Sequence, residues 1–210
     1  LDFYLWPDLA PHGYLWMIPK NSGRANVGLV TNQNNKAKPF LDEFVRRLNW
    51  QGKKVVKTFG GLIPSSGPVE NTVGNGLILV GDAAGFTSPL FEGGTHLSMK
   101  SGQYAAQAAQ NALALEDTSK EGLEEYERLW KAEFPDYSAL IKGKNALYDF
   151  TYEELNEVGR LMPHEISDIS ITQKASIGLD LLLKKRHLMK KGVMDAFKAF
   201  AYSKAEHYGW

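Results

Sequence analysis

The segment that most constrains the fold is a short apolar run that ends in a glycine and an aspartate. Residues 77–80 are all apolar, and Gly81-Asp82-Ala83-Ala84-Gly85 follows directly. A continuous apolar run bounded by glycine predicts a strand that is buried on both faces. After Pro89 and Gly93-Gly94, residues 95–115 are rich in small side chains and predict a long helix. The order is therefore strand, glycine-rich loop and helix.

This order places the Asp82 carboxylate at the carboxyl end of a strand, where ligands bind in open α/β sheets. Asp82 can accept hydrogen bonds from the sugar-alcohol hydroxyls of a cofactor, and glycines let a ligand approach the backbone. The amino end of the helix that begins near Gly94 would point to the same place, which suits an electron-rich group such as a reduced flavin ring. The alternative is a plain turn in which Asp82 only caps a helix.

The residues before this segment predict a β-rich region. Short runs rich in aromatic or apolar residues at 3–6, 14–18 and 25–30 predict strands, as does the stretch at 53–58 with its two valines, and residues 39–50 have helical spacing. The second and third runs flank turn residues and predict a hairpin with a loop of about five residues, its first strand stopped by Pro19.

The residues after the segment predict helices. Apolar spacing predicts them at 121–134, 140–150, 152–162, 177–189 and 193–208. Thr151 and Glu154 match a capping box at the start of the third of these. Leu123, Tyr126 and Trp130 fall on one face of the first. We therefore expect an α+β fold, with a β-rich part over 1–75, a strand–loop–helix part over 76–115 and a helical part over 116–210.

Composition excludes several classes of site. The 24 Lys and Arg residues balance 24 Asp and Glu residues, which removes the electrostatic argument for nucleic acid. The absence of cysteine excludes disulfides, thiolate metal sites and cysteine nucleophiles. The five histidines lack metal-ligand spacing, so we expect no metal. No apolar stretch approaches the ~20 residues that span a bilayer.

One basic cluster, 184–187 with 190–191, has two interpretations. Such a run is usually a solvated helix face. It can also contact anionic lipid headgroups. We expect a cytoplasmic protein, with peripheral membrane contact if the second interpretation holds.

Residues 77–106 resemble the second flavin-binding motif of FAD-dependent oxidoreductases of the p-hydroxybenzoate-hydroxylase type. Within that group the chain is most similar to the geranylgeranyl reductase family. The stretches that carry this similarity are YLWMIPK at 14–20, ANVG at 25–28, GGLIP at 60–64 and LEEYERLW at 123–130. The resemblance implies FAD as cofactor, with Asp82 on the ribityl chain. The residues it assigns around the flavin are Gly81, Ala83, Pro89, Gly93, Gly94 and Thr95.

The same resemblance assigns Tyr14, Trp16 and Pro19 to a substrate tunnel beside the flavin. Ile18 stands where the family tends to have Phe, which leaves the identity of the substrate open. The implied reaction is reduction of isoprenoid C=C bonds on a lipid or prenyl substrate. The electron donor would be a nicotinamide or a ferredoxin. No residue is assigned to acid–base catalysis.

The Gly-x-Gly-x-x-Gly fingerprint that binds the ADP half of FAD does not occur in the sequence. We therefore expect the C-terminal portion of a flavoprotein, which alone would be inactive and would bind FAD weakly or not at all. The resemblance makes 1–75 part of a substrate domain, 76–115 the end of the FAD-binding domain and 116–210 a helical domain. A halogenase, a hydroxylase, a quinone-linked dehydrogenase and a non-catalytic domain derived from a flavoprotein remain alternatives.

Overall fold

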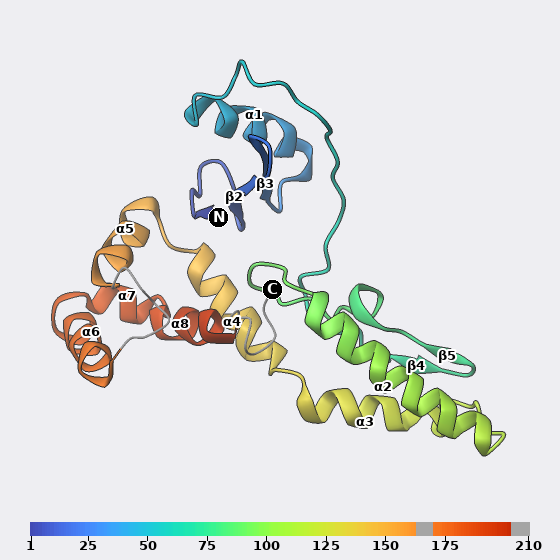
Figure 1. Ribbon diagram of the computed structural model, residues 1–210. Coiled ribbons are helices and arrows are strands. Elements are labelled where there is room, and N and C mark those ends of the chain that lie inside the picture. Colours follow the sequence, from blue (N-terminus) through green and yellow to red (C-terminus); the bar gives the residue numbers. More distant parts are fainter. Residues whose placement is uncertain (163–169, 203–210) are drawn as a thin grey trace. The chain divides into compact units, whose positions relative to one another are not determined.

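The structure is a computed structural model that describes residues 1–162 and 170–202 (Figure 1). The chain divides into two compact units. The first combines Leu1–Phe59 with Asn145–Val193, and the second combines Gly60–Lys144 with the chain from Met194 onward. The helices and small antiparallel sheets of these units confirm the predicted α+β class.

The first unit contains a three-stranded antiparallel sheet in the order β1-β2-β3. Its strands are β1 (Asp2–Tyr4), β2 (Tyr14–Lys20) and β3 (Arg24–Val30). The hairpin loop is shorter than expected, because only residues 21–23 separate β2 from β3. Strand β2 also continues through Pro19. β1 pairs with β2 only as far as Met17, so the missing N–H of Pro19 can face an open edge at no cost in ladder bonds.

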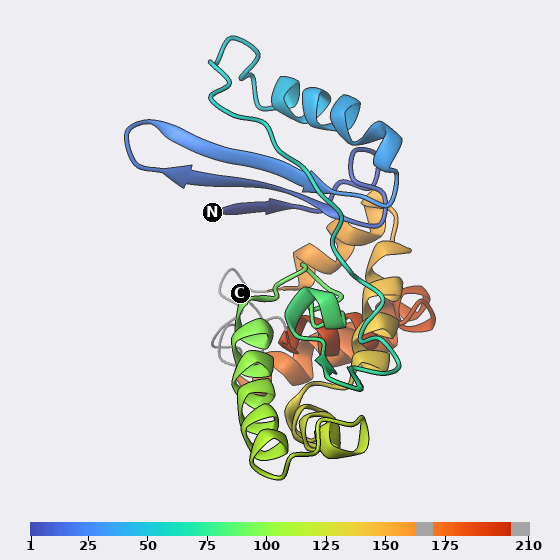
Figure 2. The same cartoon turned by 90° about the vertical axis from the view of Figure 1, so that its right-hand side faces the viewer.

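Helix α1 (Ala37–Arg47), which follows the short helix η1 (Asn34–Lys36), packs against one face of this sheet (Figure 2). Leu15 of β2 and Phe44 of α1 are both fully buried there. The Phe44 ring lies 5.2 Å from that of Tyr4 and 5.7 Å from that of Trp6. Burial of these apolar side chains is the main force that holds the helix on the sheet.

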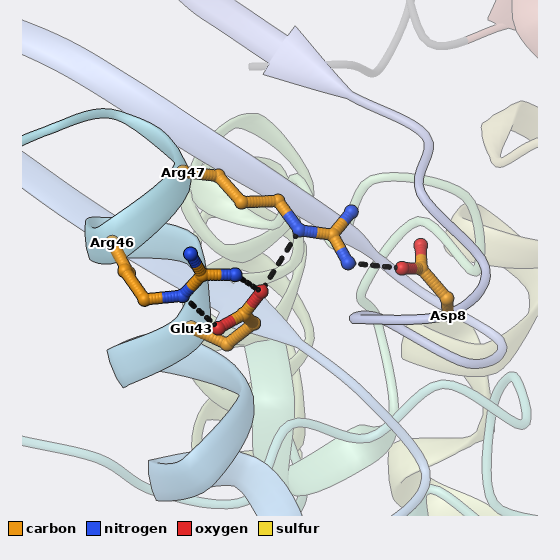
Figure 3. Close-up of polar contacts among 4 residues, drawn as sticks. All are labelled: Asp8, Glu43, Arg46 and Arg47. Atoms are coloured by element: carbon orange, nitrogen blue, oxygen red, sulfur yellow. Dashed lines mark hydrogen bonds and ion pairs between the residues drawn. The ribbon is translucent and has the colours of Figure 1, made fainter.

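A charged cluster at the end of α1 ties the helix to the turn before β2 (Figure 3). Glu43 accepts two hydrogen bonds of 2.6 Å from Arg46 and one of 3.1 Å from Arg47. Arg47 also donates to Asp8 and lies over the Trp6 ring. The hydrogen bonds from Arg46, and then those from Arg47, lower the pKa of Glu43 to about 2.

The other helices follow the predicted order with shifted ends. They are α4 (Tyr137–Tyr148), α5 (Tyr152–Leu161), α6 (Ile171–Lys184), α7 (Arg186–Lys190) and α8 (Val193–Tyr202). The capping box of Thr151 and Glu154 is confirmed. The helix predicted over 177–189 is two helices, α6 and α7, with a break at Lys185. Residues 203–208 of the last predicted helix lie outside the described residues.

The second unit is built on α2 (Thr95–Ala114) and α3 (Glu124–Glu133), which run side by side (Figures 1 and 2). The short helix η3 (Glu121–Leu123) precedes α3. Leu123, Tyr126 and Trp130 are buried in the core of this unit, as their predicted common face requires. Phe86 packs among them, 4.9 Å from the ring of Trp130.

Of two further predicted strands, the one over 77–80 is confirmed only in its first half and the one over 53–58 is wrong. Residues 77–80 form only β5 (Leu77–Ile78), paired with β4 (Val73–Gly74), and Leu77 is 53% exposed. Residues 53–58 form no strand, and Val55 and Val56 are more than 70% exposed. Burial on both faces requires elements packed on both sides of a wider sheet, and in the described residues β5 pairs only with the two-residue strand β4. No described helix is long and apolar enough to cross a membrane.

The lowered pKa of Glu43 predicts a pH-dependent contribution to stability. An unfolded Glu has a pKa of about 4.3, so the contribution is complete above that pH and is lost as pH falls toward 2. Glu43→Gln should lower the free energy of unfolding at pH 7, and its difference from the wild type should shrink between pH 6 and pH 3. Urea unfolding at several pH values measures this.

Asp42→Asn is a control on the same helix, where the exposed Lys38–Asp42 pair should contribute under about 0.5 kcal/mol. A Glu43→Gln difference that stays constant with pH would contradict the role given to the arginine hydrogen bonds.

Candidate functional site

The predicted Gly-Asp turn is a short 3-10 helix, η2 (Gly81–Ala84), that ends at Gly85. Gly81 and Gly85 both have positive φ, +54° and +76°. A Cβ on Gly85 would lie 2.4 Å from the carbonyl oxygen of Gly67, so only glycine fits this bend. The Gly85 and Phe86 N–H groups donate to the carbonyls of Asp82 and Gly81, both at 3.0 Å, and close the turn.

The turn lies directly against helix α2. A Cβ on Gly81 would lie 2.7 Å from Ser98 Oγ. The Gly81 N–H donates to Ser101 Oγ at 3.0 Å, and Ser101 Oγ donates to the carbonyl of Ser98 at 3.0 Å. Both serines belong to α2. This contact fixes the turn beside the first two turns of the helix.

Asp82 is exposed at this turn and lies beside the start of α2. Its Oδ1 accepts a hydrogen bond of 3.1 Å from Thr87 Oγ1, and a Cβ on Gly94 would lie 3.2 Å from the same oxygen. Gly94 caps α2 without a side-chain hydrogen bond. The first N–H groups of any helix lack an acceptor within the helix, so α2 directs donors and partial positive charge to the neighbourhood of an exposed carboxylate.

The other residues predicted around the cofactor belong to the same unit. Ala83 and Thr95 are exposed, Gly93 and Gly94 are half-buried, and Gly81 and Pro89 are buried. The structure therefore gathers Asp82, Ala83, Gly94 and Thr95 at one end of α2, where a ligand can reach them. Pro89 can act only through the shape of the loop that contains it.

That loop holds two residues whose importance the sequence does not signal. Phe91 and Glu92 have φ of +65° and +49°, which is costly for residues with side chains. The Ser88 N–H donates to the carbonyl of Gly93 at 2.8 Å and closes the loop. Phe91 is buried and packs on Phe200, with ring centroids 5.0 Å apart. These contacts hold the loop in a strained form.

Lys144 of α4 supports the same loop. Its Nζ donates to the carbonyl of Ser65 at 2.7 Å. Burial lowers the pKa of Lys144, and the negative charge of nearby Glu92 opposes that shift. The lysine thus links α4 to the segment before Gly67 and to the strained loop.

Polar contacts from α3, most of them half-buried, hold the segment that leads into the turn. The Tyr126 hydroxyl donates to the carbonyl of Leu79 at 2.7 Å, and burial raises the pKa of that hydroxyl. Glu127 accepts from both the backbone N–H and the hydroxyl of Thr72, at 2.8 and 3.0 Å. Trp130 Nε1 donates to the Thr72 hydroxyl at 3.0 Å.

The predicted substrate residues belong to the first unit, on β2. Tyr14 and Trp16 alternate with Leu15, so they lie on the face of β2 opposite α1. Trp16 Nε1 donates to Asn26 Oδ1 at 3.0 Å. The Trp16 ring packs directly over Gly28, where an added Cβ would lie only 2.3 Å from the nearest ring carbon. By the same alternation Pro19 lies on the α1 side. The structure brings Tyr14 and Trp16 together, with rings 5.8 Å apart, and separates Pro19 from them.

Comparison with known proteins agrees with these motifs. The geranylgeranyl reductase catalytic domain matches residues 1–63. A digeranylgeranylglycerophospholipid reductase of Methanocaldococcus jannaschii is 36% identical over 90% of this chain and 49% of its own. A second, from Methanococcoides burtonii, is 35% identical over 84% of this chain and 44% of its own.

This chain belongs to the geranylgeranyl reductase family. It spans about half the length of the relatives that it matches. The crystal structure of a geranylgeranyl bacteriochlorophyll reductase-like protein from Thermoplasma acidophilum agrees, with a TM-score of 0.74 and 27% identity over 90% of this chain and 49% of that one. The geranylgeranyl reductase family is flavin-dependent in general. The relatives of this chain given above are named as reductases.

The close approach at Gly85 predicts a large cost for any side chain there. Gly85→Ala should lower the free energy of unfolding by roughly 2–4 kcal/mol, because a left-handed backbone and a clash with a carbonyl oxygen add together. Gly76→Ala is the matched control, since Gly76 has φ +67° with nothing within 4 Å of its added Cβ. It should cost only about 1 kcal/mol. Equal losses in urea unfolding would contradict the packing described at Gly85.

Proposed function

We propose that this chain is part of an FAD-dependent oxidoreductase that reduces isoprenoid C=C bonds on a glycerophospholipid. The observation that carries this proposal is its 35–36% identity, over 84–90% of the chain, to proteins named digeranylgeranylglycerophospholipid reductase. The proposal includes an electron donor of the nicotinamide or ferredoxin class, and contact with the membrane that holds the lipid.

The residues at the start of α2 fit a flavin. Asp82 presents an exposed carboxylate, which is the acceptor that the hydroxyls of a ribityl chain require. Gly94 adds no side chain beside that carboxylate, and a Cβ there would already crowd Asp82 Oδ1 at 3.2 Å. The first turn of α2 supplies N–H donors and partial positive charge to an electron-rich ring.

In this proposal a bound, reduced flavin would supply the hydride for one alkene carbon, and solvent or the flavin would supply the proton for the other, while the protein binds and orients the reactants. Asp82 accepts hydrogen bonds from the ribityl hydroxyls. Gly93, Gly94 and Thr95 would lie against the ring system, and Pro89 would shape the loop beside it. Gly81 and Ala83 belong to the same turn as Asp82 and would position its carboxylate. Half-buried Trp16 would offer an aromatic surface to the apolar substrate, buried Tyr14 would support the Trp16 ring, and Pro19 would act from the opposite face of β2. An apolar substrate needs burial and orientation from these residues rather than a charged partner.

The assignment of Asp82 predicts a loss of FAD affinity when its carboxylate is removed. Asp82→Ala in the complete enzyme should raise the Kd for FAD by about tenfold or more, because hydrogen bonds to a charged group are worth about 1.5–3 kcal/mol. Fluorescence titration with FAD measures this. Glu70→Ala is a control on an exposed carboxylate of the same unit. Unchanged affinity in Asp82→Ala would remove the role given to Asp82.

The reaction itself is tested without oxygen. The complete enzyme, supplied with a chemically reduced flavin, should reduce the double bonds of an isoprenoid glycerophospholipid, which mass spectrometry detects as a gain of 2 Da per bond, roughly the mass of two hydrogens. Turnover that requires oxygen and leaves the alkene intact would contradict the proposal and favour a halogenase or hydroxylase. A protein that binds no FAD would favour a non-catalytic domain.

A further inference from the structure

Helix α6 is apolar on its outward side as well as on its buried side. Leu181 faces the interior of the first unit and is 1% exposed. Leu179, Leu182 and Leu183 are 56%, 52% and 68% exposed. A helix at the surface of a globular protein normally presents polar residues to water, so three exposed leucines on one short helix need an explanation.

The exposed leucines form a continuous stripe. Positions 172, 175, 176, 179, 182 and 183 recur at the spacings of three and four that place residues on one side of a helix, and all six are exposed. We call Thr172, Ala175, Ser176, Leu179, Leu182 and Leu183 the outer stripe of α6. It contains small, hydroxyl and leucine side chains and no charged group.

Basic residues lie at the carboxyl end of this stripe. Arg186 Nε donates to the carbonyl of Leu182 at 3.2 Å, which places the guanidinium beside the last leucines. Lys190 is exposed on the next helix, α7. Both residues lack an acidic partner among the ion pairs of residues 1–162 and 170–202.

The remaining charges of the basic cluster are already neutralised. Lys184 pairs with Asp180 at 2.7 Å, and Lys191 pairs with Glu154 at 2.7 Å. Lys185 and His187 both reach Glu157, at 3.0 and 3.1 Å. The uncompensated charge next to the outer stripe is therefore that of Arg186 and Lys190, and it is positive.

We propose that the outer stripe of α6, with Arg186 and Lys190, docks on the surface of an anionic phospholipid bilayer. The leucines enter the boundary between headgroups and acyl chains, and the two cations contact phosphates. We choose an anionic bilayer as the partner because the leucines and the cations occur together. An apolar stripe alone would suit any apolar partner, whereas the positive charge at its end favours an anionic surface. The inference rests on the proposed function, because a lipid substrate resides in such a surface.

The binding requires both contributions. Three leucines that enter only the interface bury part of their area, and two cations add about a fivefold gain in binding each at an anionic surface. Single weak signals give reversible binding, whereas two together give stable attachment. Salt screens the cations and leaves the leucines unaffected.

Flotation of the complete enzyme with vesicles tests the proposal. Vesicles of phosphatidylcholine with an equal share of phosphatidylglycerol should carry the chain upward, and pure phosphatidylcholine vesicles should carry much less. Leu179→Ser with Leu183→Ser should lower the partition coefficient about tenfold or more. Arg186→Glu with Lys190→Glu should lower it similarly on anionic vesicles and remove most of its salt dependence.

Matched controls distinguish binding through this surface from nonspecific binding by exposed leucines or lysines elsewhere. Leu113→Ser with Leu115→Ser removes leucines that are 67% and 78% exposed at the end of α2, and Lys53→Glu with Lys54→Glu reverses two exposed lysines elsewhere. Both control pairs should bind vesicles like the wild type. Circular dichroism and thermal unfolding should be unchanged in all variants, because every altered side chain is exposed.

Three outcomes would overturn the proposal. They are absence of flotation, equal losses in test and control pairs, and a stripe variant that changes the mass of the particle by light scattering while vesicle binding stays the same. The last would assign the stripe to contact between two copies of the chain. Vesicle binding needs no flavin, so its failure leaves the FAD titration and alkene reduction to decide the proposed function separately.

Discussion

The backbone of Gly81 lies directly against helix α2, and the candidate site depends on this contact. No side chain fits between Gly81 and Ser98, and the Gly81 N–H reaches across to Ser101 Oγ. A larger residue would push the turn away from the helix and would separate Asp82 from the start of α2. The carboxylate and the helix dipole act on one place only because glycine permits this approach.

Helix α3 provides the second support of the same turn. Its tyrosine holds the carbonyl of Leu79, and its glutamate and tryptophan hold Thr72 on the neighbouring segment. The strand there is only two residues long, so these hydrogen bonds perform much of the positioning that a wide sheet would otherwise perform. The strained loop at Phe91 and Glu92 persists because Phe91 is buried against Phe200 and the hydrogen bond from Ser88 to Gly93 closes the loop.

Sequence patterns predicted the positions of the helices better than they predicted which segments pair as strands and become buried. Helical spacing found α1, α2 and α3 with small shifts at the ends, and the capping box at Thr151 was correct, because these signals depend on residues within one or two turns. The strand predicted at 53–58 was wrong and the one at 77–80 was shorter and more exposed than expected, because a short run extends as a strand only where other strands pair with it. Strand β2 continued through Pro19 for the related reason that pairing at its edge was open there.

The sequence by itself determined the Gly-Asp turn, the long small-residue helix after it and the aromatic β2 segment, since each needs particular residues at fixed short spacings. Only the tertiary structure decided which side chains meet. It placed Asp82 beside Gly94, put Tyr14 and Trp16 on one face with Pro19 on the other, and turned three leucines of α6 outward. These relations depend on contacts between residues far apart in the chain, and local spacing carries no information about such contacts.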